Sequence, residues 1–191
     1  VLPKAEGGAS VNELNRRLTE RGNATAKILA IATETPAAIF QLGTYGGMKR
    51  LAGLTWGAED LPAAIGASTS REEDGSYTAP YQLARSLCLF GAAAAGVLPI
   101  GALYPVFKDA KGLAAYAARA RRDGFAGMMA IHPDQVPIIN QAFTPSKEEI
   151  AHAKAVVEAF RANPNAGALS LDGRMIDRPH LVQAQRILGM A

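Results

Sequence analysis

The sequence has a single cysteine, Cys88, so no disulfide can form within the chain. A lone thiol suits a reducing cytoplasm, where we expect the protein to work. Because free cysteines usually pack as small hydrophobes, we interpret Cys88 as a core residue on a helix. Long apolar runs are also lacking: the longest, around residues 87–100, is interrupted by glycine and proline. It stays short of the roughly 20 residues that span a bilayer. A charged start followed by an apolar block, as in a signal peptide, is not found.

Neither sign of charge is in large excess, since the net charge is +3 and the pI is about 9.1. The basic residues are scattered, and no aromatic residues are interleaved with them. This pattern favours solvated helix faces over a nucleic-acid interface. No phosphate-binding loop and no convincing dinucleotide motif is present. A basic rim could still attract a small ligand that carries phosphate.

Hydrophobic residues, by contrast, make up 49% of the chain, which excludes a disordered protein, and 191 residues suffice for one domain with a core. Short apolar runs alternate with segments of helical pattern. This order predicts an α/β fold with a parallel sheet or barrel that is covered on both faces. The expected strands are fewer than the eight of a closed barrel, and the first opens the chain without an initiator methionine, so we expect an incomplete chain. The expected strands cover residues 1–6, 27–33, 51–57, 97–103 and 125–131.

Helix signals separate these runs. Ser10 and Glu13 form a capping-box pattern at the start of one expected helix. Thr35 followed by Pro36 indicates the N-cap and the first residue of another. Residues 68–78, the most polar stretch, are an expected surface loop. Longer helices are expected over residues 79–95, with Leu83, Leu87 and Phe90 on one side, and over residues 109–122, with Leu113, Tyr116 and Ala120 inward.

The last part of the chain, residues 144–191, lies outside the βα alternation. Ser146 and Glu149 form a second capping box, which opens a helix through Phe160. A turn and a final amphipathic helix follow, so we expect a helix–turn–helix extension. Because this amphipathic extension has no place in the layers of a barrel, we expect it to pack on a neighbouring subunit.

Two carboxylates stand where apolar runs end: Glu34 follows residues 27–33, and Asp60 follows residues 51–57. The carboxyl ends of parallel strands meet on one face, where a buried carboxylate needs a cation or hydrogen bonds. Two carboxylates with no neighbouring Cys or His suit a hard cation such as Mg²⁺, which keeps several waters. The alternative is that both acids simply precede helices and are stabilised by the helix dipole.

Several motifs occur in order along the chain: Leu2-Pro-Lys-Ala-Glu6, Thr33-Glu-Thr-Pro-Ala37, Trp56-Gly-Ala-Glu-Asp-Leu61, Gly124-Phe-Ala-Gly127 with Ala130-Ile-His-Pro133, and Met175-Ile-Asp-Arg-Pro179. Together they resemble the HpcH/HpaI aldolase and citrate lyase beta subunit family, in its acyl-CoA lyase-like branch. The resemblance implies a TIM barrel, of which residues 1–143 hold strands four to eight, followed by a C-terminal extension over residues 144–191.

The resemblance also implies functional residues. Glu34 and Asp60 match the Mg²⁺-binding carboxylates, and the backbone N–H groups around Gly57, Ala58 and Glu59 match the loop that holds the substrate carboxylate. Asp177 matches an aspartate that reaches a neighbouring subunit's active site as general acid or base. An N-cap before Pro179 explains Asp177 equally well.

The implied function is a Mg²⁺-dependent carbon–carbon lyase that cleaves or forms a 3-hydroxyacyl-CoA through a metal-stabilised enolate. Its partners would be an acyl-CoA or 2-keto acid substrate and copies of itself, as a trimer or hexamer. Two alternatives stay open: an aldolase that releases pyruvate from free 2-keto acids, and a non-catalytic member that binds a CoA ester. The second is motivated by two departures, since the family usually has an acid near Gly101 and a lysine at Met128.

Two further sets of residues have open roles. His132 lies between a strand and Pro133, and we interpret it as a turn residue because a single histidine lacks the partner that a catalytic base needs. Lys4 and Glu6 end the first strand, where they either line the site or form salt bridges.

Overall fold

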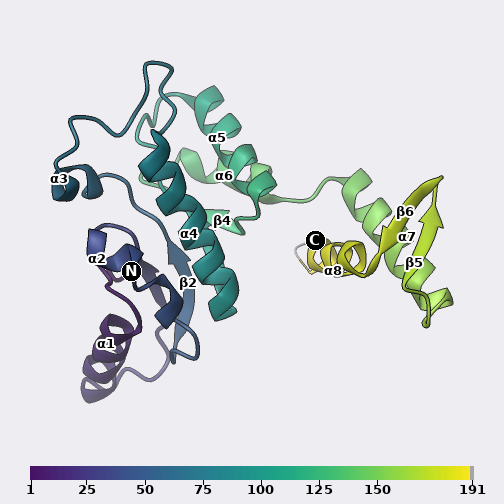
Figure 1. Ribbon diagram of the computed structural model, residues 1–191, viewed down its shortest axis with the longest axis horizontal. Helices are drawn as coiled ribbons and strands as arrows, with labels where there is room; N and C mark the ends of the chain where they lie inside the picture. The colour runs from purple at the N-terminus through teal and green to yellow at the C-terminus, as the bar shows by residue number, and fades with distance from the viewer. Residues whose placement is uncertain (190–191) are drawn as a thin grey trace. The chain divides into compact units, whose positions relative to one another are not determined.

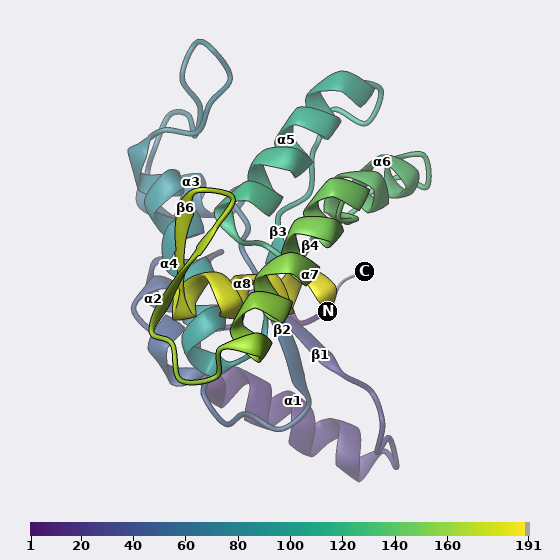
Figure 2. The same cartoon turned by 90° about the vertical axis from the view of Figure 1, so that its right-hand side faces the viewer.

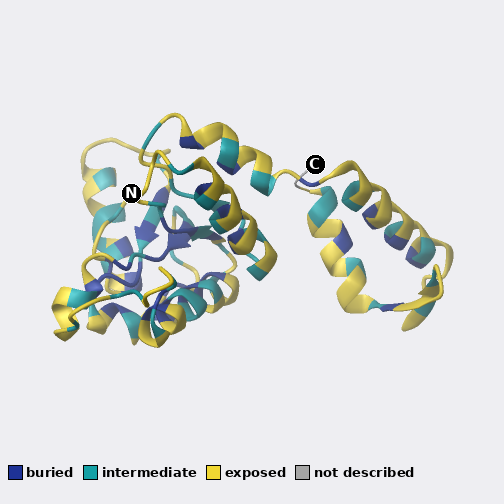
Figure 3. Cartoon of the chain, turned by 90° about the horizontal axis from the view of Figure 1, so that it is seen from above, coloured by how far each residue is buried: buried dark blue, intermediate teal, exposed yellow. Residues whose placement is uncertain are grey.

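The structure is a computed structural model that describes residues 1–189. The chain divides into two compact units, Val1–Phe143 and Thr144–Ala191, which are described separately here. In both units the dark blue buried residues of Figure 3 gather along strands and on one side of each helix. Within the described residues, no helix has the length and apolar character that crossing a membrane requires.

The first unit is built on a parallel sheet in the order β1-β2-β3-β4. Leu2 adds a parallel bridge to Ala30 at the outer edge of β1. The predicted α/β class with a parallel sheet is therefore confirmed, and the sheet among the described residues is open. The strands are β1 (Ile28–Ile31), β2 (Leu51–Thr55), β3 (Leu98–Gly101) and β4 (Gly127–Met128).

Helices connect consecutive strands, as a parallel sheet requires. Figure 1 shows α4 crossing beside the strands, and Figure 2 shows α5 and α6 lying side by side. The helices of this unit are α1 (Gly8–Glu20), α2 (Pro36–Ile39), the 3₁₀ helix η1 (Leu42–Thr44), α3 (Leu61–Ile65), α4 (Ala79–Ala95), α5 (Ala110–Asp123) and α6 (Gln135–Phe143).

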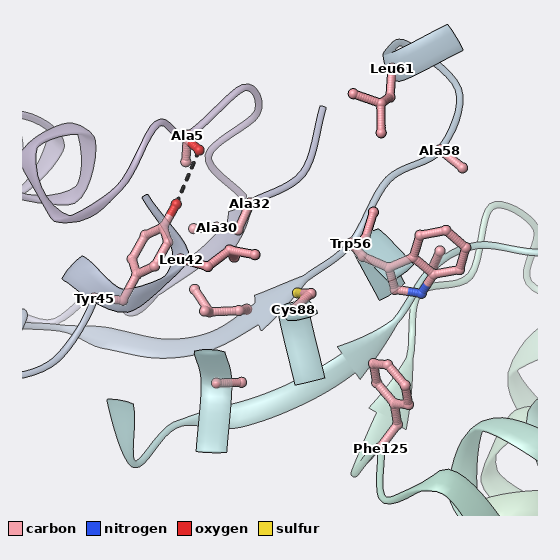
Figure 4. Packing of buried hydrophobic residues seen from close by; sticks show 14 of the residues in the cluster. Ala5, Ala30, Ala32, Leu42, Tyr45, Trp56, Ala58, Leu61, Cys88 and Phe125 are labelled. Atoms are coloured by element: carbon pink, nitrogen blue, oxygen red, sulfur yellow. Dashed lines mark hydrogen bonds between the residues drawn. The ribbon is translucent and has the colours of Figure 1, made fainter. Parts of the chain in front are cut away.

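The core of this unit lies between the sheet and its helices (Figure 4). Trp56 and Leu54 are buried at the end of β2, and Cys88 is fully buried on α4, as predicted. Burial raises the pKa of the Cys88 thiol to about 12. The Tyr45 hydroxyl donates to the Ala5 carbonyl oxygen at 3.0 Å, which ties the first segment of the chain to the core.

Three local predictions for this unit are wrong. The strand expected over residues 1–6 is reduced to the bridge between Leu2 and Ala30. Helix α1 begins at Gly8 rather than at Ser10, whose hydroxyl instead accepts a hydrogen bond from the Glu6 N–H at 3.0 Å. On α4, Leu83 and Phe90 are 59% and 64% exposed, because a different side of the helix faces the core, with Tyr81, Ala84, Cys88, Gly91 and Ala92 buried. Helix α6 was not expected at all.

The second unit packs two helices against a short β-hairpin (Figure 1). The predicted capping box is confirmed, since Ser146 Oγ accepts from the Glu149 N–H at 3.1 Å at the start of α7 (Lys147–Ala162). The predicted helix–turn–helix is wrong, because β5 (Ala168–Leu171) and β6 (Arg174–Asp177) pair antiparallel before α8 (Arg178–Leu188). The core of the second unit consists of Ala153, Val156, Phe160, Ile176 and Ala184.

Candidate metal and substrate site

The ends of β1 and β2 are fastened to one another just beyond the sheet. The Ala32 N–H donates to the Thr55 carbonyl oxygen at 2.9 Å. The Thr33 hydroxyl donates to the Gly57 carbonyl oxygen at 3.1 Å and accepts from the Gly57 N–H at 2.9 Å. These bonds hold the segments that carry Glu34 and Asp60 side by side at the carboxyl edge of the sheet.

A cavity of about 240 Å³ opens at this edge. It brings together all of the metal and substrate residues expected in the first unit. Its wall is completed by apolar and aromatic side chains from β1, from the loops that follow β2, β3 and β4, and from the loop between α3 and α4. The lining residues are Ile31, Glu34, Trp56, Gly57, Ala58, Glu59, Asp60, Tyr77, Ala102, Leu103 and Met129.

One residue, Lys4, contacts both expected metal ligands. Its backbone N–H donates to Glu34 Oε2 at 2.6 Å, and its ammonium lies 3.2 Å from Asp60 Oδ1. Glu34 is 9% exposed, whereas the Asp60 side chain is 48% exposed. The two carboxylates therefore lie within reach of a single residue, one buried in the floor of the site and one near its mouth.

Neither carboxylate caps the helix that it precedes. Thr35 caps α2, since its hydroxyl accepts from the Ala38 N–H at 3.2 Å. Asp60 stands at the N-cap position of α3 but makes no side-chain capping bond. The helix-start explanation of the two acids thus lacks the hydrogen bonds that it would require, and both carboxylates keep oxygens for another partner.

The donor set fits a hard cation. Among residues 1–189, no group of three or more His, Cys, Asp and Glu side chains is placed to hold a metal. Mg²⁺ does not need such a group, because it is commonly held by one or two carboxylates and keeps several waters or substrate oxygens. Glu34 and Asp60 are the residues that could hold it.

Gly57 allows the loop after β2 to approach Glu34. A Cβ atom at this position would lie 3.1 Å from Glu34 Cγ and 3.2 Å from Ile31 Cγ2. Its N–H is already bonded to Thr33, so of the three N–H groups expected to hold a substrate carboxylate, those of Ala58 and Glu59 remain candidates.

An aromatic wall that sequence reasoning missed borders the cavity. The rings of Trp56 and Tyr77 meet edge to face with centroids 5.0 Å apart. The Arg71 guanidinium lies 4.0 Å from the centre of the Tyr77 ring, and it also donates to the Tyr77 hydroxyl at 2.8 Å. Burial raises the pKa of Tyr77. Tyr77 is the one buried residue of the expected polar loop, and an aromatic residue in that setting was the available signal.

His132 belongs to a turn, as expected. The Gln135 side chain is fully buried and accepts from the Ile131 and His132 N–H groups at 2.9 and 3.3 Å. The His132 ring stacks on Phe107 with centroids 5.1 Å apart. These contacts account for His132 without a catalytic role.

Asp177 lies in the second unit, at the N-cap of α8. Its Oδ1 lies 2.5 Å from His180 Nδ1. The Asp177 backbone N–H donates to the same ring nitrogen at 3.2 Å. The side-chain contact with His180 holds the pKa of Asp177 below its ordinary value. The sequence did not single out His180, although its place three residues after an N-cap aspartate is a capping-box position.

The chain is an α/β protein with an open parallel sheet, and an acidic pair and a cavity lie together at the carboxyl edge of that sheet. Residues 1–133 match the model of the HpcH/HpaI aldolase/citrate lyase family, and the chain belongs to that family. Members of this family include lyases that act on carbon–carbon bonds.

Two relatives and one solved structure illustrate the likeness. A citrate lyase subunit beta-like protein of Mycobacterium tuberculosis is 37% identical over 191 residues, which cover 100% of this chain and 66% of the relative. The mitochondrial citramalyl-CoA lyase of Rattus norvegicus is 33% identical over 164 residues, which cover 85% of this chain and 46% of the relative. The chain thus spans two thirds or less of the length of these relatives.

The solved structure is that of CitE from Mycobacterium tuberculosis in complex with magnesium, acetoacetate and coenzyme A. It matches with a TM-score of 0.79 and 34% identity, covering 98% of this chain and 66% of that one. The predicted membership of this family is therefore confirmed, and the solved neighbour contains the predicted cofactor.

Proposed function

We propose that this chain carries the metal site of a Mg²⁺-dependent carbon–carbon lyase, with Glu34 and Asp60 as the protein ligands. The observation that supports the proposal best is that both carboxylates line one cavity at the carboxyl ends of adjacent parallel strands while neither caps its helix. Parallel α/β folds place their active sites at this edge.

Some residues of the cavity would stabilise charge, and others would exclude water. Magnesium would supply Lewis-acid stabilisation for the charge that develops on the enolate oxygen of the substrate, a contribution of several kcal/mol. The N–H groups of Ala58 and Glu59 would orient the substrate carboxylate. Trp56 and Tyr77 form an apolar wall, and a wall of this kind strengthens the electrostatic interactions within the site.

A 3-hydroxyacyl-CoA thioester is the substrate class that we favour, of the citramalyl or malyl type. The family relative named as a citramalyl-CoA lyase and the coenzyme A in the solved neighbour support this class. Asp177 would act as general acid or base, and its hydrogen bond to His180 keeps the carboxylate ionised. An aldolase acting on free 2-keto acids is the alternative, supported by the oxaloacetate bound with magnesium in another solved citrate lyase beta subunit of M. tuberculosis, which is 35% identical.

The two departures from the family pattern do not touch the carboxylate pair. Gly101 and Met128 are direct partners across β3 and β4. A Cβ at Gly101 would lie 3.5 Å from Met128 Cγ, so the methionine side chain covers the glycine. We therefore interpret the missing acid and the missing lysine as one coupled change at two neighbouring positions.

The wider assembly is also a proposal. The Leu2 segment and β4 are the outer elements of an open sheet, and in a complete TIM barrel further strands would pair with both. We propose a cytoplasmic homo-oligomer, a trimer or hexamer, in which the second unit contributes Asp177 to a neighbour. Light scattering of the full-length protein would show a monomer if this assembly is wrong.

The deciding experiment combines metal binding with a substrate screen. Calorimetry should show Mg²⁺ uptake by the wild type and at least tenfold weaker uptake by Glu34→Ala, because a buried ligand is lost. A panel of CoA thioesters and 2-keto acids, tested with the full-length gene product, should then reveal cleavage. Equal Mg²⁺ uptake by both proteins rules out the metal site. Mg²⁺ uptake without cleavage of any panel member favours the non-catalytic member that binds a CoA ester.

A further inference from the structure

Lys4 is held in an unusual backbone conformation beside the site. The Leu2 carbonyl oxygen accepts from the Ile31 N–H at 2.9 Å, and the Ala5 N–H donates to the Ile31 carbonyl oxygen at 3.1 Å. Between these two bonds to β1, Lys4 takes a left-handed conformation with φ of 49°. Such a conformation is unfavourable for a residue that has a Cβ atom. Backbone strain at the edge of a cavity therefore suggests a function that offsets it.

The cavity itself is strongly acidic. Glu34, Glu59 and Asp60 line it, and no lysine or arginine is among its lining residues within the part of the chain that the structure describes. An organic acid that enters this cavity meets three carboxylates. The Lys4 ammonium, 3.2 Å from Asp60 Oδ1, supplies positive charge at its edge.

The contact between Lys4 and Asp60 is of a kind that a divalent cation can displace. The two side chains are 60% and 48% exposed, and an ion pair this exposed to water contributes little to stability. Mg²⁺ at Asp60 would either remove the ammonium from the carboxylate or lie close to a like charge. In both cases the ammonium opposes metal binding.

We propose that Lys4 is a positioning residue of this site whose ammonium neutralises Asp60 until Mg²⁺ replaces it and then turns to the carboxylate of the bound acid. The inference rests on the proposed function, because it takes Asp60 as a metal ligand. It assigns the strained residue two effects of opposite sign: Lys4 weakens the binding of the metal and strengthens the binding of the anionic substrate.

Calorimetry on the full-length protein separates these effects. Lys4→Met should bind Mg²⁺ about three- to tenfold more tightly than the wild type, since it loses the competing charge. The Mg²⁺-loaded variant should bind acetoacetate about tenfold more weakly, the change expected for a lost charge-assisted contact. Lys4→Arg, which keeps the charge, should stay near the wild type in both measurements.

Matched variants exclude indirect causes. Lys27→Met removes one positive charge at the opposite end of β1 and should leave both affinities unchanged. Lys4→Gly relieves the left-handed backbone and removes the charge, so it should behave as Lys4→Met if charge is the cause. Circular dichroism checks that each variant is folded, and Lys4→Gln replaces Lys4→Met if the latter is not.

The outcomes distinguish the two levels of the proposal. Absence of Mg²⁺ uptake by the wild type rejects the metal site and the role of Lys4 with it. Wild-type uptake that Lys4→Met leaves unchanged or weakens rejects the role of Lys4 alone. Tighter metal binding without weaker acetoacetate binding rejects the substrate contact.

Discussion

Asp60 in the first unit and Asp177 in the second stand at the same kind of position and do different things. Each occupies the N-cap of a helix that has proline in its first turn. The Asp177 carboxylate contacts His180, which lies three residues further along the chain in α8. Asp60 makes no capping bond, and its partner is Lys4, a residue distant in sequence that follows the bridge between Leu2 and Ala30.

The contrast shows that an acid before a helix does not reveal its own role. What separates the two cases is the surrounding structure. In the first unit, Thr35 supplies the cap of α2 and leaves the neighbouring Glu34 free for the cavity. In the second unit the aspartate and histidine satisfy each other, as expected for a capping pair. A carboxylate that is released from capping is the better candidate for a ligand.

The largest expected effect comes from replacing each of the two aspartates by asparagine and titrating the variants with Mg²⁺. Asp60→Asn should reduce Mg²⁺ affinity by about 100-fold or more, because even outer-shell changes cost 10–100-fold. Asp177→Asn should leave Mg²⁺ affinity unchanged. Calorimetry on both variants measures this, and comparable losses in the two would remove the distinction between the units.

A smaller effect is expected from Gly57→Ala, which tests the packing that positions Glu34. The added methyl group would lie 3.1 Å from Glu34 Cγ, so the side chain must shift by a few tenths of an ångström. We expect Mg²⁺ affinity to fall about tenfold while the fold persists. Gly43→Ala is the matched control, because an added Cβ there meets nothing within 4 Å. An unchanged affinity in Gly57→Ala would show that the close approach does not matter for the ligand.

The same contrast explains how much the sequence could predict. Four of the five expected strands of the first unit are observed, because continuous apolar runs mark strands that are covered on both faces, whereas residues 1–6 contribute only the bridge of Leu2. The carboxylates at their ends followed from the topology. Helix α6 was missed, since Pro137 interrupts its apolar pattern, and the hairpin was missed because the short stretch before Asp177 reads equally well as a loop.

Contacts between distant segments were beyond reach. Nothing in the local sequence of Lys4 indicates that its backbone meets Glu34 while its ammonium meets Asp60. Tyr77 likewise reaches Trp56 only through the path of the loop that carries it. Residues that join a site from distant parts of the chain are found only once the fold is known. A capping pair such as Asp177 and His180 can be found from its spacing in the sequence.

The smallest expected effect is an acid transition confined to α8. The hydrogen bond from His180 lowers the pKa of Asp177 from its ordinary value of 3.8. A group whose pKa is lower in the folded state stabilises the fold above its ordinary pKa and loses that contribution as the pH falls through the folded value. Amide exchange in α8 should therefore accelerate below about pH 4, with only a small change in overall unfolding, because Asp177 is exposed. Asp177→Asn caps the helix without titrating and should lack this step, so a transition that persists in this variant must arise from another group.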